Sequence, residues 1–388
     1  MPRTIATGKI PVKIWADVVE PGAMEQVMNL AAYPFAFHHI AIMPDVHEGF
    51  GMPIGGVMAT RGVIVPNAVG VDIGCGMIAV KTSLREISRR VLERLVQEIR
   101  TVIPLGFDHH KKARDERYMP DMAVEEMPVV EREYESARHQ VGTLGGGNHF
   151  IEIQKGDDGH VWVMIHSGSR NLGKQVADHY NRLAVSLNKK ENIRGTWEKQ
   201  LAYLYLDSEE GRRYIREMEY CVAFGFANRR LMMENVLELI DFFVQGGVEE
   251  VDRVAISHNY AAEEEHFGET VWVHRKGATP AFRGQRGIIP GSQGMESYIV
   301  AGRGNEESFS SCSHGAGRMM GRRQAIRTLD LQGEVQRLEA RGIIHSIRRK
   351  KDLDEAPSAY KDIHRVIDLQ RDLIDVLVGL QPLAVVKG

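Results

Sequence analysis

The chain has 388 residues, of which 43% are hydrophobic and 26% are charged, as in an ordinary soluble protein with a large core. The net charge of −3 gives no overall nucleic-acid signature, so a polyanionic partner has to meet a local basic patch. No apolar run approaches the ~18 residues of a membrane helix, so we expect no membrane association. Cys75, Cys221 and Cys312 are far apart and odd in number, which argues against a disulfide framework and favours a reducing, cytoplasmic compartment.

The first part of the chain alternates short apolar runs with glycine-rich turns, and helical periodicity follows it. The glycines and prolines between the runs mark turns and loops. In chain order, the predicted elements are strands at 37–43, 54–60 and 76–80, a loop at 44–51, a helix from a capping box at 83–86 to about 104, and a helix at 129–139.

The second part continues this mixture without an internal repeat or a long linker. The predicted elements are a hairpin of strands at 150–154 and 161–165, a helix after 171, a long helix at 208–243, strands at 254–257 and 270–274, and a last helix at 363–380. This order predicts a mixed α+β fold, one domain over residues 1–388, in which helices cover a largely antiparallel sheet.

Five side chains are candidate metal ligands. Asp72 and Cys75 lie three residues apart in a glycine-rich run, and three histidines, His149, His166 and His258, stand at the ends of predicted strands. A thiolate with imidazoles suits Zn²⁺, Mn²⁺, Co²⁺ or Fe²⁺. Five ligands exceed one tetrahedral site, so two ions that share the thiolate are one interpretation. Structural, hydrogen-bonded histidines and a buried, inert thiol are the other, and both remain open.

A second group of residues surrounds His314. If a helix begins near His314, then Arg318 and Arg322 lie on the same helical face. Guanidinium groups repel an imidazolium, but they bind the oxygens of a phosphate that is attached to the imidazole. This environment suits a nucleophilic histidine that forms a phosphoramidate. The alternative is a capped helix start with solvated arginines, which the residues alone do not exclude.

Residues 168–175 fit the pattern GxxxxGK of a P-loop, between a predicted strand and a predicted helix. Gln175 stands where the Mg²⁺-binding Ser or Thr is required. We therefore favour the weaker interpretation that Arg170 and backbone amides at a helix N-terminus hold a phosphate. Other loops suit anions, although each taken alone is better explained as an ordinary turn: 275–278, 290–294 and the loop at Lys387.

Taken together, these motifs resemble the RtcB family of RNA-splicing and RNA-repair ligases. The resemblance spans nearly the whole chain, in order. The matching runs are 43–47, 70–76, 142–145, 147–152, 166–170, 258–260, 275–278, 287–292, 304–318, 360–363 and 386–388. The resemblance implies a GTP- and Mn²⁺-dependent ligase that joins an RNA 3′-phosphate or 2′,3′-cyclic phosphate end to a 5′-hydroxyl end, in tRNA splicing or RNA repair.

The resemblance also implies a role for each candidate metal ligand. Two Mn²⁺ ions would share Cys75. Asp72 and His149 would complete the site of one ion, and His166 and His258 would complete the site of the other.

The nucleophile and the nucleotide contacts follow from the same resemblance. His314 would attack the α-phosphorus of GTP and carry GMP as a phosphoramidate. Tyr360 would stack on the guanine, and Lys387 would lie at its edge. The residues that would hold the nucleotide are Asn148, Glu152, Gly291, Ser292, Gly315, Ala316, Gly317, Tyr360 and Lys387. Those that would contact RNA or nucleotide phosphates are Asp45, Arg170 and Arg318.

Two residues depart from the family pattern. Glu48 and Phe50 stand where some members carry an apolar residue and a lysine, which removes a positive charge near the expected RNA entrance. We expect a monomer that ligates RNA. The rival functions are a paralogue that guanylylates 3′-phosphates as a cap with weak sealing, a non-catalytic RNA-end-binding protein and a P-loop NTPase.

Overall fold

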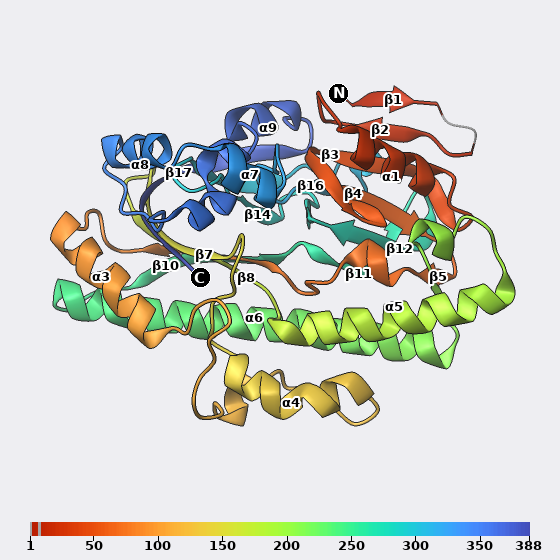
Figure 1. The fold of residues 1–388 in the computed structure, drawn as a ribbon, viewed down its shortest axis with the longest axis horizontal. Coiled ribbons are helices and arrows are strands. Elements are labelled where there is room, and N and C mark those ends of the chain that lie inside the picture. The colour runs from red at the N-terminus through yellow and green to blue at the C-terminus, as the bar shows by residue number, and fades with distance from the viewer. Residues whose placement is uncertain (1, 7–8) are drawn as a thin grey trace.

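The structure is a computed structural model that describes residues 2–6 and 9–388. Two sheets lie above a layer of long helices (Figure 1). The six-stranded sheet has the order β1-β2-β3-β4-β12-β11, and the seven-stranded sheet has the order β10-β6-β8-β7-β17-β15-β14. Among the described strand pairs, only β2–β3 is parallel. The predicted mixed α+β class with largely antiparallel pairing is confirmed, although the strands form two large sheets.

The strands vary from segments of two or three residues to β3 and β17, which have 15 and 14 residues. The six-stranded sheet consists of β1 (Arg3–Ile5), β2 (Val12–Ile14), β3 (Ala36–Phe50), β4 (Met52–Thr60), β12 (Glu269–Lys276) and β11 (Asn259–His266). The seven-stranded sheet consists of β10 (Glu250–Ser257), β6 (Gly76–Thr82), β8 (Val161–Ser167), β7 (Phe150–Gly156), β17 (Ile374–Lys387), β15 (Ser297–Gly302) and β14 (Arg286–Ile289). Two ribbons pair β13 (Ala278–Pro280) with β16 (Ser311–Ser313) and β5 (Val63–Ile64) with β9 (Leu204–Tyr205).

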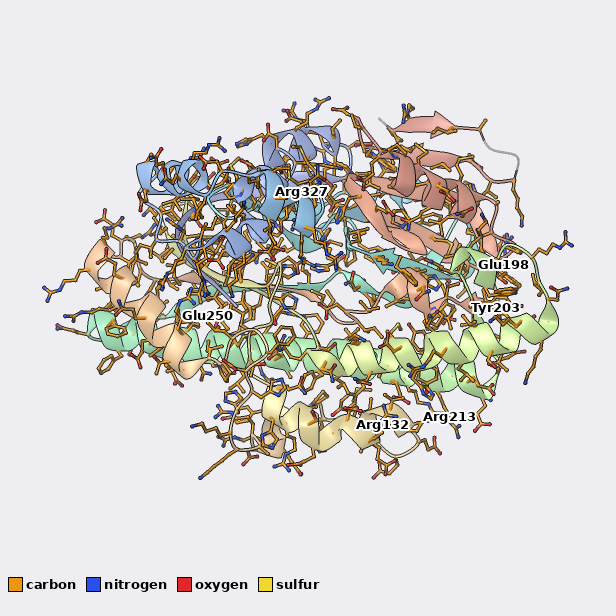
Figure 2. All side chains as sticks on the ribbon, in the orientation of Figure 1. Arg132, Glu198, Tyr203, Arg213, Glu250 and Arg327 are labelled. Carbon is orange, nitrogen blue, oxygen red and sulfur yellow. The ribbon has the colours of Figure 1, made fainter. Side chains whose placement is uncertain are left out.

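The helices cover the sheets from two sides. The helix α5 runs beside α6 below the sheets, with α4 beneath them, and the labelled Arg132 and Arg213 lie on this helical side (Figures 1 and 2). The α-helices are α1 (Pro21–Ala31), α2 (Pro66–Val69), α3 (Arg89–Val102), α4 (Pro128–Gln140), α5 (Asn171–Glu191), α6 (Glu209–Val244), α7 (Arg322–Thr328), α8 (Leu331–Ala340) and α9 (Ile363–Leu369). The 3₁₀ turns are η1 (Glu116–Tyr118), η2 (Trp197–Lys199), η3 (Glu306–Ser308), η4 (Lys350–Glu355) and η5 (Pro357–Ala359). No helix of the described residues is long and apolar enough to cross a membrane.

The long helix α6 connects the two sheets. Ser208 caps its first turn by accepting a hydrogen bond from the backbone N–H of Gly211, and 36 residues give it a length of about 54 Å. It packs against β6, β8 and β10 of one sheet and β11 of the other. Phe224 lies in the core shared with α4 and α5, and Met232 lies in the core under the seven-stranded sheet. The helix therefore fixes the ends of several strands relative to one another.

The predicted hairpin at 150–165 and the helices at 129–139 and 208–243 are confirmed as β7–β8, α4 and α6. The predicted last helix at 363–380 is wrong. Only α9 is helical there, and β17 begins at Ile374 between β7 and β15. The segment is rich in valine and leucine, and backbone pairing with two neighbouring strands outweighs its helical spacing.

Three other local predictions are also wrong. Residues 44–50 form the second half of β3 instead of a loop, but with two register shifts that follow Ile42, so the pairing there is irregular. The helix α3 begins at Arg89 behind the cap Ser88, six residues after Ser83. No helix begins at His314, because three glycines between residues 315 and 321 follow β16 and delay the helix to α7.

Candidate metal centre and nucleotide site

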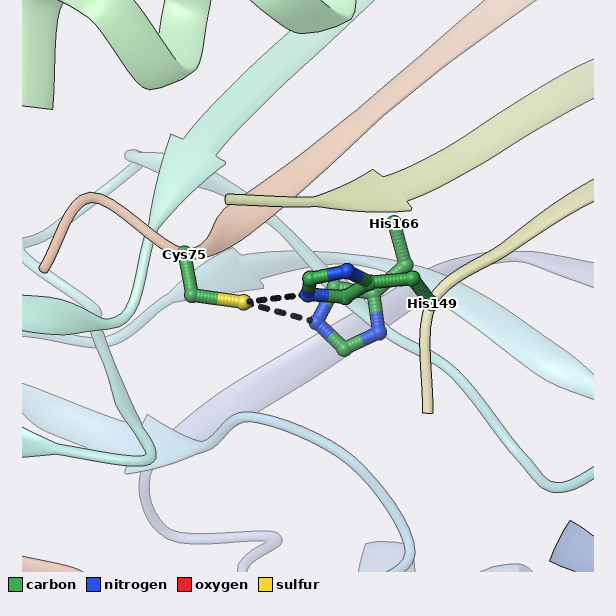
Figure 3. Close-up of side chains that lie close together, drawn as sticks. All are labelled: Cys75, His149 and His166. Atoms are coloured by element: carbon green, nitrogen blue, oxygen red, sulfur yellow. Dashed lines mark hydrogen bonds between the residues drawn. The ribbon is translucent and has the colours of Figure 1, made fainter. Parts of the chain in front are cut away.

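The five predicted metal ligands lie together at the ends of strands. Cys75 Sγ lies 3.4 Å from His149 Nε2 and 3.3 Å from His166 Nε2 (Figure 3). Beyond them, Asp72 Oδ2 lies 3.2 Å from His149 Nε2, and His258 Nε2 lies 3.4 Å from His166 Nε2. The thiol therefore stands between two pairs of donor groups, which is the position of a ligand that two ions can share.

Glycines allow the backbone around Cys75 to pack closely on both sides. Gly74 has a φ of +76°, and a Cβ there would lie 2.5 Å from the backbone oxygen of Cys221 on α6. A Cβ at Gly76 would lie 2.1 Å from the backbone oxygen of Ile256 on β10. No side chain fits at either position, so the glycine-rich run holds the thiol against α6 and β10.

The donor groups are electrically suited to a cation. Burial lowers the pKa of His166 and of His258 well below the usual value, and neighbouring histidines add to this effect, so both rings are neutral. Burial raises the pKa of the Cys75 thiol, and the nearby Asp72 raises it further. Such a thiol becomes a thiolate only beside a positive charge. One thiol, one carboxylate and three imidazoles fit transition-metal ions such as Mn²⁺ or Zn²⁺.

Arg229 of α6 holds three of the strand ends, and the sequence did not reveal it. The side chain is fully buried and donates to the backbone oxygens of Gly74 at 2.9 Å and Ser167 at 2.8 Å, and to Ser257 Oγ at 3.3 Å. These residues directly precede or follow Cys75, His166 and His258 in the chain. Burial lowers the pKa of Arg229 to about 10, so it remains protonated at neutral pH. It positions the donors without being one of them.

His314 follows β16 and lies against the metal centre. Its Nδ1 lies 2.6 Å from Asp45 Oδ2, which also accepts the backbone N–H of His314 at 3.1 Å. The ring centroid lies 4.8 Å from that of His258. Because the carboxylate accepts the Nδ1 proton, the lone pair is on Nε2, the atom that can attack a phosphorus.

Asp45 is fully buried, so the prediction that it contacts RNA phosphates is not supported. Burial alone would raise its pKa, but the hydrogen bond and favourable interaction with His314, with help from Lys361, hold the pKa below its usual value. Lys361 Nζ also donates to the backbone oxygens of Pro44 and Val46 and so fixes the segment that carries Asp45. The two hydrogen bonds from His314 therefore fix its ring and backbone against Asp45.

A cavity of about 410 Å³ opens beside His166 and His314. All nine residues predicted to hold the nucleotide line it, together with Arg318. Glu152 lies deep in this wall, where burial raises its pKa to about 8 in spite of the nearby Lys387 and a hydrogen bond from Gln154. The cavity therefore connects one of the metal donors, His166, and His314 with the residues predicted to hold the nucleotide.

Glu355, a residue that the sequence did not reveal, organises one side of the cavity. Its carboxylate accepts from Arg318 at 3.1 Å and Arg322 at 2.9 Å, and it also accepts the hydroxyl of Tyr360. Burial opposes ionisation of Glu355, but Lys387 and the two arginines bring its pKa to about 2. Arg318 and Arg322 therefore meet at one carboxylate although no helix joins them to His314.

Arg170 lies next to the metal centre and does not line the cavity. Its backbone has a φ of +58°, uncommon outside glycine, and its side chain donates to Thr143 Oγ1 at 2.9 Å and to the backbone oxygen of Gly106 at 2.7 Å. Lys174, four residues later, pairs with Asp178 on the exposed side of α5. Lys174 does not line the cavity, so it does not take the place of a P-loop lysine beside the nucleotide.

The predicted basic loop at 275–278 is part of the core. Arg275 is fully buried and donates to Glu264, Ser311 and the backbone oxygen of Phe309. Lys276 donates to two backbone oxygens in the interior. These cations have structural partners and do not form an anion site on the surface.

Comparison with known proteins identifies the family. The family model described as tRNA-splicing ligase RtcB matches residues 26–134 and 120–388. The chain is 39% identical to the RNA-splicing ligase RtcB of Escherichia coli (strain K12) in an alignment of 411 positions that covers 99% of both chains. It is 33% identical to the tRNA-splicing ligase RtcB of Methanococcus maripaludis and 30% identical to that of Thermococcus kodakarensis. Each of these alignments has 460 positions and covers 98% of this chain and 95% of the relative. The chain belongs to the RtcB family of RNA-splicing ligases, and it is an RNA ligase.

Proposed function

We propose that this ligase joins RNA ends that carry a 3′-phosphate or 2′,3′-cyclic phosphate to ends that carry a 5′-hydroxyl, with GTP as the energy source and two Mn²⁺ ions at the metal centre. The observation that carries the proposal is the contact of 2.6 Å between Asp45 and His314 Nδ1, which leaves His314 Nε2 free beside the metal donors. The proposal includes a monomeric, cytoplasmic protein in which residues 1–388 form one ligase unit.

The chemistry of the first step follows from the free Nε2. His314 Nε2 forms a bond to the α-phosphorus of GTP while the bond to pyrophosphate breaks. The carboxylate of Asp45 stabilises the positive charge that develops on the imidazole. Mn²⁺ ions held by the five donors would neutralise the triphosphate and orient the leaving pyrophosphate.

The later steps use the same histidine as a leaving group. An oxygen of the RNA 3′-phosphate attacks the phosphorus of GMP, and His314 leaves. The 5′-hydroxyl oxygen of the second RNA then attacks the RNA 3′-phosphorus, and GMP leaves. A cyclic phosphate is first opened by water to a 3′-phosphate, and metal ions held by the same five donors would assist this step.

The cavity supplies the contacts for guanosine. The carboxylate of Glu152 accepts N–H groups of the guanine, and Lys387 lies at the edge of the base. Tyr360 stacks on the base, and the guanidinium of Arg318, 5.0 Å from the centroid of its ring, fixes Tyr360 in this position.

The experiment that tests the proposal is incubation with α-labelled GTP and Mn²⁺. We expect acid-labile, alkali-stable label on the protein, which then passes to a 3′-phosphate RNA and is released as GMP when a 5′-hydroxyl RNA is joined. His314→Ala should abolish labelling, whereas His364→Ala, at a surface histidine, should not. A metal-loaded protein that never acquires label would overturn the proposal.

One observation favours a second candidate, the addition of GMP to RNA 3′-phosphates as a cap. Glu20 and Glu48 line the cavity next to His47, and Phe50 beyond them is 54% exposed. Negative charge at this wall weakens the hold on the second, 5′-hydroxyl RNA. Transfer of label to a 3′-phosphate RNA without joining would favour this candidate.

A further inference from the structure

A second pocket, of about 240 Å³, adjoins the nucleotide cavity. The two share Gln293, Glu355 and Lys387 in their walls. Basic side chains from two separate segments line the second pocket. They are Arg100 of α3, Arg348 and Arg349 of the loop that leads into η4, and Lys351 of η4 itself.

The end of this loop and the start of η4 form the run Arg-Arg-Lys-Lys at residues 348–351, and all four side chains are exposed. Among the residues that the structure describes, none of the four forms a salt bridge. Asp352 instead accepts the backbone N–H groups of Arg348 and Arg349 at 2.9 Å and so fixes the loop. Glu355 is occupied by Arg318 and Arg322. Three acids, Asp352, Asp354 and Glu355, line the pocket against five cations, which include Lys387, so the pocket keeps a net positive charge.

Arg100 brings a further cation to the same place. Its guanidinium donates to Ser346 Oγ at 2.7 Å, and its Nε is buried without a partner in the described residues. Burial lowers the pKa of Arg100, the charge of Arg348 lowers it further, and Asp352 offsets part of this shift. Like charges held together in a half-buried pocket are unfavourable, and an anion that enters the pocket removes the repulsion.

We propose that this pocket binds backbone phosphates of the RNA strand whose end enters the nucleotide cavity. The chain has a net charge of −3, so RNA must be held by a local basic surface, and this one shares a wall with the cavity. Arginine forks and lysines bind phosphate without reading the base. The inference rests on the proposed function, because it requires RNA to reach that cavity.

The test compares two variants that each lose two positive charges. In Arg349→Ser/Lys351→Ser both changed residues line the pocket. In the control, Lys190→Ser/Arg194→Ser, both are exposed near the end of α5, which lies at the opposite end of the molecule from α8 (Figure 1). The Kd of a single-stranded 3′-phosphate RNA is measured over a range of salt concentrations. Each lost phosphate contact should lower the slope of log K against log salt by about 0.7, so by about 1.4 for the pocket variant.

The control should keep the slope of the unmodified protein. Equal slopes for the pocket variant and the control would overturn the inference. A pocket variant that binds GTP less tightly with an unchanged RNA slope would assign the pocket to a free nucleotide and also overturn it. Labelling of the unmodified protein by GTP tests the proposed function separately. No labelling together with a lower slope for the pocket variant would remove the histidine mechanism and still support the RNA site.

Discussion

Replacing Asp45 with Asn removes the charge that faces the nucleophile. Asp45 is fully buried, and its Oδ2 lies 2.6 Å from His314 Nδ1. With an effective dielectric constant of about 20, two unit charges at this distance interact by about 6 kcal/mol, and delocalisation over the carboxylate and the ring reduces this to about 3–4 kcal/mol. Because about 1.4 kcal/mol corresponds to a tenfold change in rate, Asp45→Asn should slow guanylylation of His314 by about 10²–10³-fold.

The assay is the rate at which acid-labile label accumulates from α-labelled GTP in a single turnover, with Mn²⁺ in excess. The matched control is Asp17→Asn, since Asp17 is a surface acid that pairs with Arg365, and its rate should not change. If Asp45→Asn binds as much Mn²⁺ as the unmodified protein and is labelled equally fast, the assigned role of Asp45 is refuted.

Cys75→Ser should release both Mn²⁺ ions and His258→Ala only one; metal analysis that finds a single ion lost from both variants would contradict a shared thiolate. Burial raises the pKa of Glu152 to about 8, so its carboxylate is depleted below that pH. GTP affinity should therefore rise about 15-fold from about pH 6.5 to about pH 8, and Glu152→Gln should flatten this profile. Arg229→Met leaves two backbone oxygens without their donor and should lower the free energy of unfolding of the metal-free protein by about 2–4 kcal/mol in urea. A loss below about 0.5 kcal/mol would contradict its positioning role.

The proximity of the metal donors could be anticipated because strand ends and a hairpin constrain them. In the β7–β8 hairpin, Phe150 pairs with His166, so the preceding His149 must lie near His166. Cys75 precedes β6, which pairs with β8, and His258 follows β10, which pairs with β6. Once these strands are predicted and paired, the metal donors at their ends necessarily lie close together.

The supporting residues could not be anticipated, because their roles depend on contacts across the fold. Arg229 lies in a helix and Glu355 at the end of the charged 3₁₀ turn η4, places where such side chains are usually solvated. Only tertiary packing buries them beside their partners. The same holds for Asp45. The sequence suggests a contact with RNA, but in the fold β3 places Asp45 against His314. The sequence of β17 also predicts a helix, because short apolar runs fit both the helical and the strand period. Pairing with β7 and β15 makes the segment a strand.

The central claim is that His314 is the group that carries GMP. The most direct measurement is mass spectrometry of peptides from protein that was incubated with GTP and Mn²⁺ and kept at alkaline pH. The account predicts the added mass of one GMP on the imidazole of His314 and its disappearance after addition of a 3′-phosphate RNA. GMP on any other residue, with His314 unmodified, would contradict it.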